Sequence, residues 1–127
     1  MIRKDIIMDL VAWIEGNLNY SLHLDDIANK CGYSKWHLQR VFKTVTGYNL
    51  SSYIRARRLS SSAIDLRSTD QPILHISIKY GFYSQQTFSR AFRKMFGVSP
   101  GQYRNLDFYD NSKLLKPVSI STSDVST

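Results

Sequence analysis

Trp36, Gln39, Arg40 and Lys43 combine an aromatic ring, an amide and two cations at positions i, i+3, i+4 and i+7. In a helix this spacing places the four side chains on one face. Arginine can bind guanine and glutamine can bind adenine through paired hydrogen bonds in the major groove, and an aromatic ring can rest on a thymine methyl group or a sugar. The face therefore suits the recognition of base edges. The alternative interpretation is a solvated polar face with one amphipathic tryptophan.

The helix that must position these side chains is predicted between Ser34 and Gly47. Ser34 can accept a hydrogen bond from a first-turn N–H, and glycine is typical of the residue that ends a helix. A short helix ending near Cys31 and a glycine-bearing turn precede it, which is the helix-turn-helix pattern. The opposite face of the predicted helix carries an apolar stripe: Leu38, Val41, Phe42 and Val45.

The same pattern occurs again fifty residues later. The shift aligns the caps Ser34 and Ser84, and it aligns Arg40 with Arg90. Upstream of the second cap the shift is forty-nine, so Tyr83 is a one-residue insertion. Two copies of one design indicate a repeated unit, and the repeat favours base recognition over a solvated face. The polar face of the second copy consists of Gln85, Gln86, Ser89, Arg90 and Arg93.

The remaining segments complete an all-α fold. Helical periodicity predicts a buttressing helix over residues 6–18, with Asp5 as its cap, and a connecting helix over 50–66, with Asn49 as its cap. Pro72 suits the first position of a helix, so a new helix is expected to begin there and open the second unit. Ser99 is expected to cap a last short helix.

This order divides the chain into two helix-turn-helix subdomains, residues 1–49 and 68–106, joined by a connecting helix at 50–67. A flexible tail without a role in DNA binding is expected over 107–127, because the stretch is rich in Ser, Thr and Asp. Disorder is expected from Ser119 onward. Five apolar residues of the tail could pack back on the body: Leu114, Leu115, Pro117, Val118 and Ile120.

The connecting helix carries Arg55, Arg57 and Arg58. One interpretation places these arginines near phosphates. The other makes them a basic solvated face that pairs with Asp65 or Asp70.

The charge of the 127-residue chain, formally +7, follows the two repeats. Residues 27–64 contain seven basic side chains and no acidic one, and residues 71–106 contain five and none. A polyanion that runs past both units is therefore the expected partner, and double-stranded DNA fits best.

Other classes of function find no support in the sequence. A single Cys31 excludes an internal disulfide and is expected to be a small core residue in a reducing cytosol. His23, His37 and His75 lack the spacing of metal ligands, and there is no glycine-rich phosphate loop or nucleophile elbow. We therefore expect no catalytic residue, metal or cofactor. The apolar run near the N-terminus is too short and too charged for a signal peptide or membrane span.

Three segments resemble the AraC/XylS transcription regulators, and within them the MarA/SoxS/Rob group. They are Gly-Tyr-Ser-Lys-Trp-His-Leu-Gln-Arg (32–40), Tyr-Ile-Arg-Ala-Arg-Arg (53–58), and Tyr-Gly-Phe-Tyr-Ser-Gln-Gln-Thr-Phe-Ser-Arg (80–90) followed by Phe-Arg-Lys-Met-Phe-Gly-Val-Ser-Pro (92–100). The resemblance covers about residues 6–105. It implies a seven-helix body whose two recognition helices enter successive major-groove segments of an asymmetric site, bound as a monomer. The positions that match the DNA-contacting residues of the group are Trp36, Gln39, Arg40, Gln85, Gln86, Ser89 and Arg90.

The resemblance also implies a bacterial, cytoplasmic and nucleoid-associated activator that contacts RNA polymerase. The genes controlled by this group concern multidrug efflux and antibiotic resistance, superoxide stress and reduced porin. An architectural or weakly specific DNA-binding protein is the alternative, but the amide-rich second face suits base edges better than phosphates.

Two features depart from the group. His23 stands where a better cap such as Ser is usual, which costs about 1 kcal/mol or less. Only a short tail follows Arg104, whereas Rob carries a large effector-sensing domain there. We therefore hypothesise that synthesis and degradation, rather than a bound inducer, set the activity.

Overall fold

The computed structural model describes residues 4–20 and 22–119, and this part of the chain contains helices and no strand. The predicted all-α class is confirmed. Within the same residues, no helix is both long and apolar enough to cross a bilayer. The elements are α1 (Lys4–Gly16), α2 (Leu24–Cys31), α3 (Lys35–Thr46), α4 (Leu50–Ser68), α5 (Ile73–Lys79), α6 (Gln85–Phe96), α7 (Pro100–Arg104) and the 3-10 helix η1 (Asn111–Lys113).

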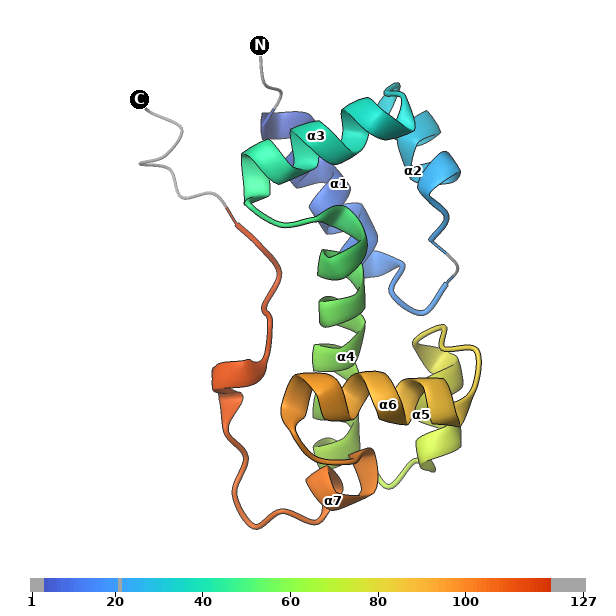
Figure 1. The fold of residues 1–127 in the computed structure, drawn as a ribbon, viewed down its shortest axis with the longest axis vertical. Helices are drawn as coiled ribbons and strands as arrows, with labels where there is room; N and C mark the ends of the chain where they lie inside the picture. Colours follow the sequence, from blue (N-terminus) through green and yellow to red (C-terminus); the bar gives the residue numbers. More distant parts are fainter. Residues whose placement is uncertain (1–3, 21, 120–127) are drawn as a thin grey trace.

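Helix α4 is the spine of the molecule. Figure 1 shows α1, α2 and α3 at one end of it, here called the first lobe, and α5, α6 and α7 at the other end, the second lobe. Buried apolar side chains occur along the whole length of α4, from Leu50 and Tyr53 near its start to Ala63 and Leu66 near its end. Because one helix supplies a wall to both cores, the two lobes share it.

The cores of the two lobes differ in composition. The second lobe is filled with aromatic rings whose neighbouring centroids lie 4.5–5.6 Å apart, in the range of favourable ring pairs. These rings belong to Phe88, Phe92, Phe96 and Tyr103. The first lobe is mainly aliphatic, and its fully buried residues include Ile7, Leu10, Ile14 and Leu38.

The helix ends follow local capping chemistry. Ser34 accepts a hydrogen bond from the backbone N–H of His37 at 3.1 Å, and Ser84 accepts the equivalent bond from Thr87 at the same distance. The predicted caps of α3 and α6 are thus confirmed. His23 occupies the N-cap of α2 without a side-chain hydrogen bond, as expected. The predicted cap Asp5 is wrong: α1 begins at Lys4, so Asp5 lies inside its first turn.

Neither interpretation of the connecting-helix arginines holds for Arg57 and Arg58. Arg57 is only 7% exposed, and it pairs with Glu15 of α1 through a 3.0 Å bond from Nε to Oε2. Arg58 donates to the carbonyl oxygens of Leu18, at 3.0 Å, and Tyr20, at 2.6 Å. Both side chains therefore fasten α4 to α1 and its following loop, in place of phosphates or the predicted aspartates.

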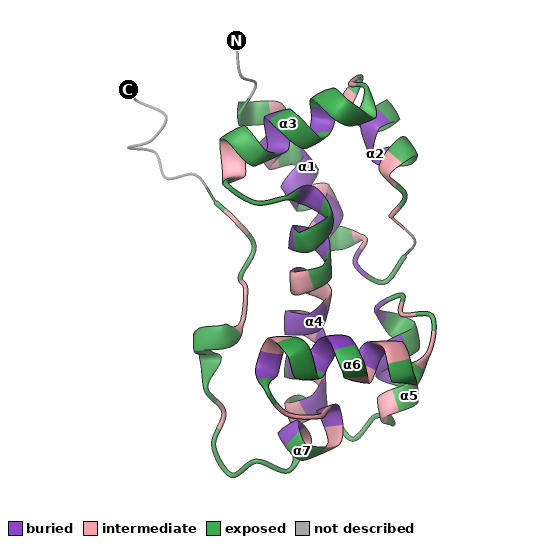
Figure 2. Ribbon diagram, in the orientation of Figure 1, coloured by how far each residue is buried: buried purple, intermediate pink, exposed green. Residues whose placement is uncertain are grey.

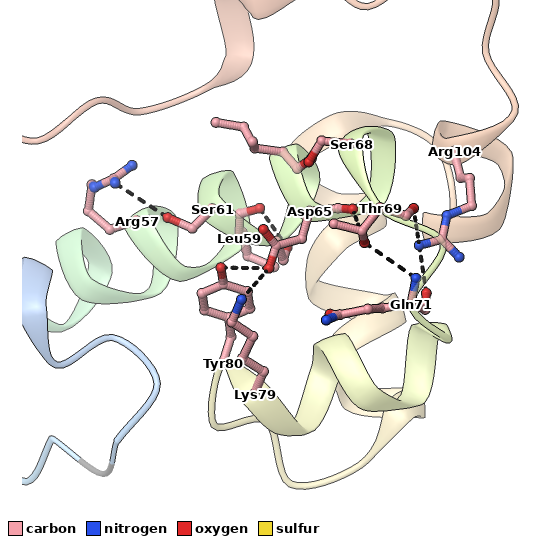
Figure 3. Close-up of polar contacts among 12 residues, drawn as sticks. Arg57, Leu59, Ser61, Asp65, Ser68, Thr69, Gln71, Lys79, Tyr80 and Arg104 are labelled. Atoms are coloured by element: carbon pink, nitrogen blue, oxygen red, sulfur yellow. Dashed lines mark hydrogen bonds and ion pairs between the residues drawn. The ribbon is translucent and has the colours of Figure 1, made fainter.

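Asp65, one of those predicted partners, binds the second lobe. Its Oδ2 accepts hydrogen bonds from the Lys79 ammonium at 2.9 Å and the Tyr80 hydroxyl at 2.8 Å (Figure 3). Burial and the neighbouring carboxylate raise the pKa of Tyr80, so its hydroxyl stays protonated and donates. This cluster holds the end of α5 against α4.

Residues 107–119, part of the tail expected to be flexible, lie beside the body and are called the strap. The backbone N–H of Leu115 donates to Ser60 Oγ at 2.8 Å, and that of Val118 donates to the Tyr53 hydroxyl at 3.0 Å. Arg57 donates to the Leu115 carbonyl oxygen. The expected packing holds for Leu114, Leu115 and Val118, which are half-buried. Pro117 is exposed. Ile120 and the rest of the stretch expected to be disordered lie outside the described residues, except for Ser119.

Candidate nucleic-acid interface

Helices α3 and α6 have equivalent places in the two lobes. Each is the second helix of a helix-turn-helix pair, after α2 and α5 respectively. In Figure 1 both cross the view in the same direction, one near each end of α4. In Figure 2 exposed and buried stretches of ribbon alternate along both helices, which is the pattern of a helix with one buried face.

The first predicted face lies outward on α3. Trp36 is 66% exposed, and Gln39, Arg40 and Lys43 are exposed beside it. The guanidinium carbon of Arg40 lies 5.2 Å from the centre of the Trp36 ring. Such a cation–π contact orients the guanidinium without neutralising it. No ion pair among the described residues involves Arg40, so its hydrogen-bond donors are available to a ligand.

The second predicted face lies outward on α6. Gln85, Gln86, Arg90 and Arg93 are exposed, and Ser89 is half-buried. Arg93 is the one member of this face with a described partner, since its Nη2 lies 3.4 Å from Gln102 Oε1 on α7. The structure therefore brings each set of predicted residues together on its own helix.

A cleft between the two lobes is the part of this surface that sequence reasoning missed. Its volume is about 520 Å³, and it is lined from α4 by Ser51, Ser52 and Arg55 and from the second lobe by Tyr83 and Thr87. Arg55 and Tyr83 were each notable in the sequence, as a basic residue of the connecting helix and as an insertion. Only the packing of the lobes shows that they face one cleft.

The described residues contain no group of three or more His, Cys, Asp or Glu side chains that could hold a metal ion. Cys31, expected in the core, is half-buried at the end of α2, and burial raises the pKa of its thiol. His23, His37 and His75 are exposed.

A family model described as a helix-turn-helix domain matches residues 27–106. Over 105 residues the chain is 50% identical to the regulatory protein SoxS of Escherichia coli strain K12, which covers 83% of this chain and 98% of SoxS. The chain belongs to the AraC/XylS family, in the MarA/SoxS/Rob group. This is a family of DNA-binding transcription regulators and not of enzymes.

The transcriptional regulator Rob of Salmonella typhimurium strain LT2 is 58% identical over 104 residues, or 82% of this chain. The match is 36% of Rob, so the chain spans about a third of that relative. The transposon Tn10 TetD protein of Escherichia coli is 57% identical over 99 residues, which cover 78% of this chain and 72% of TetD.

Solved structures show the same fold. The C-terminal domain of AraT, a response regulator from Geobacillus stearothermophilus, superposes with a TM-score of 0.75 at 30% identity, covering 83% of this chain and 91% of that one. An AraC-type regulator from Chromobacterium violaceum superposes with a TM-score of 0.72 at 32% identity, covering 79% and 89%.

Proposed function

We propose that the protein is a transcriptional activator that binds an asymmetric promoter site as a monomer, with α3 and α6 in successive major-groove segments. The observation that carries the proposal is the pair of exposed polar faces, presented by two similarly directed helices on one shared spine. One chain then supplies both half-site readers and needs no partner subunit. Successive major-groove segments on one side of B-DNA lie on the order of 34 Å apart, and a bend that brings both onto the protein costs a few kcal/mol.

The residue types assign the roles within each face. Arg40 and Arg90 are suited to paired hydrogen bonds with guanine, and the amides of Gln39, Gln85 and Gln86 to adenine. Trp36 would contact a thymine methyl group or a sugar, and Ser89 either a base edge or the backbone. Lys43 and Arg93 lie nearer the ends of their helices and would bind phosphates.

The regulatory context rests on the relatives. SoxS is named a regulatory protein and Rob a transcriptional regulator, and a relative from Escherichia coli strain K12 that is 58% identical over 104 residues is named right origin-binding protein. We extend this to activation through contact with RNA polymerase at promoters of multidrug-efflux and oxidative-stress genes. The protein would act in the bacterial cytoplasm, at the nucleoid.

The alternative function is weakly specific, architectural DNA binding. It is supported by the net charge of +7, which alone would attract any duplex. The second face opposes it, because three of its five residues, Gln85, Gln86 and Ser89, are uncharged. Uncharged donors and acceptors add little to nonspecific attraction, but they distinguish bases.

The test is to select binding sites from a random duplex pool and measure the best site with Arg40→Ala and Arg90→Ala. We expect a site of about 20 base pairs, and a loss of about 1–3 kcal/mol for each variant. Each substitution should relax base preference at a different end of the site. Lys116→Ala, an exposed charge in the strap, is the control and should keep both preferences. If no sequence is enriched and both arginine variants lose affinity equally on all DNA, the architectural function replaces the proposal.

A further inference from the structure

We propose that the cleft between the lobes is a third DNA contact, in which Arg55 and Tyr83 bind the phosphodiester backbone of the base pairs between the two half-sites. The inference rests on the proposed function, because it assumes that α3 and α6 contact one duplex. It adds a contact that belongs to neither recognition helix.

The position of the cleft follows from the spine. Figure 1 shows the start of α4 between α3 and α6. A duplex that contacts both helices on one side must therefore pass over this part of α4. The cleft lies there, with a volume of about 520 Å³, and is lined by Ser51, Ser52 and Arg55 from the first two turns of α4. None of the described residues that line it is acidic.

Arg55 is the cation of this cleft whose side chain is available to bind a phosphate. Arg57 is held by Glu15, and Arg58 is held by two backbone carbonyl oxygens. Arg55 is exposed, and within the described part of the chain its side chain makes no hydrogen bond or ion pair. An unpaired guanidinium beside two serine hydroxyls, near the N-terminus of a 19-residue helix, offers donors and a favourable dipole to a phosphate.

Arg58 adds fixed positive charge beneath the same cleft. Its guanidinium carbon would lie 3.4 Å from a Cβ placed on Gly81, so it contacts the turn before α6. Gly81 has φ +77°, a conformation that also favours glycine. Burial lowers the pKa of Arg58, but an arginine remains protonated in proteins, and it therefore contributes to the potential of the cleft.

Tyr83 faces the cleft from the second lobe. The side chain is 97% exposed and immediately precedes the cap Ser84 of α6. A solvent-exposed aromatic ring at the start of α6 can pack on a sugar of the DNA, and its hydroxyl can donate to a phosphate. Because Arg55 and Tyr83 come from opposite sides of the cleft, one backbone strand could contact both.

The experiment measures affinity against salt concentration on the selected site and on a scrambled duplex, for the wild type, Arg55→Ala and Lys116→Ala. For Arg55→Ala, loss of one phosphate contact should make the slope of log K against log salt less negative by about 0.9 on both duplexes. Base preference should not change. Lys116→Ala removes the same charge from the strap and should leave the slope unchanged. Tyr83→Ala should weaken binding about 2- to 10-fold on both duplexes.

Neutral methylphosphonates at the central phosphates locate the contact. They should weaken the wild type more than they weaken Arg55→Ala, which keeps only the contributions of Tyr83 and Arg58 to these phosphates. If the wild type binds selectively but Arg55→Ala keeps the full slope, or changes preference at one base pair, the cleft assignment is wrong and the proposed function stands. If the wild type shows no selectivity at all, the proposed function fails.

Discussion

Arg57 shows how one side chain can connect three segments that are distant in the sequence. From the middle of α4 it binds Glu15 of α1, the Leu115 carbonyl oxygen of the strap and, at 3.4 Å, the Ser61 hydroxyl. Its side chain is 8% exposed, whereas that of Glu15 is 33% exposed. The cation therefore depends on its partners more than the carboxylate does.

Replacing Glu15 with Gln should destabilise the protein by about 2–4 kcal/mol, because it leaves the buried Arg57 guanidinium without its counterion. Urea unfolding measures the loss. Asp25→Asn is the matched control: it breaks the pair between Lys35 and Asp25, whose side chains are 57% and 71% exposed. That variant should lose about 1 kcal/mol or less. Equal losses for the two variants would show that Arg57 does not need its carboxylate.

The fate of the three connecting-helix arginines marks the limit of sequence reasoning at the residue scale. All three are arginines on neighbouring positions of one helix. Arg57 and Arg58 nevertheless bind other parts of the protein, whereas Arg55 is exposed. The partners of Arg57 lie 42 and 58 positions away along the chain. No local pattern encodes such a choice, because it depends on which carbonyl and carboxylate oxygens the tertiary packing brings within reach.

The helices themselves were more predictable, because their ends are set by nearby residues. Ser34, Ser84 and Ser99 each accept a capping hydrogen bond from the backbone N–H three residues later. Gly47 and Gly97, both with φ +81°, end α3 and α6. The equivalent places of α3 and α6 in the two lobes likewise followed from the fifty-residue repeat. The cleft between the lobes was not predictable, since it is formed by residues of different elements that share no local pattern.

Helix α2 offers a direct test of capping. His23 has the extended backbone of an N-cap, with φ −86° and ψ 138°, but its side chain accepts no capping bond. His23→Ser should therefore stabilise the protein by about 0.5–1 kcal/mol and raise Tm by about 2–6 °C. Ser34→Ala, which removes the existing cap of α3, should cost about 1 kcal/mol. Both changes can be followed by circular dichroism during heating. A lower Tm for His23→Ser would mean that the imidazole has a role which capping does not describe.

At the scale of the whole molecule, the strap joins the two lobes from the outside. Lys113 donates to the Phe96 carbonyl oxygen at the end of α6, and Arg67 of α4 binds Asn111 at 2.7 Å. Farther along, Val118 reaches Tyr53 at the start of α4, and it lines an apolar hollow with Met8 and Val11 of α1. The strap thus spans the length of the spine from the second lobe to the first.

A chain that ends at Leu106 should be less stable than one that ends at Ser119 by about 3 kcal/mol. The estimate takes about 1 kcal/mol for each of the bonds that Arg57, Ser60 and Tyr53 make with the strap backbone. Urea unfolding of both chains measures the difference. Amide exchange should also accelerate in both lobes of the shorter chain. Equal stability would show that the strap lies on the body without supporting it.

The shared spine also limits how this repeat can recombine. The first half of α4 belongs to one core and the second half to the other, while Arg57 in its middle holds both α1 and the strap. A hybrid that joins the first lobe of one family member to the second lobe of another must place its junction inside α4. Such a junction takes Glu15 from one parent and the strap from the other, so Arg57 keeps only one of these two partners from its own parent. Although the sequence contains two copies of one pattern, the two lobes therefore cannot be exchanged separately between family members.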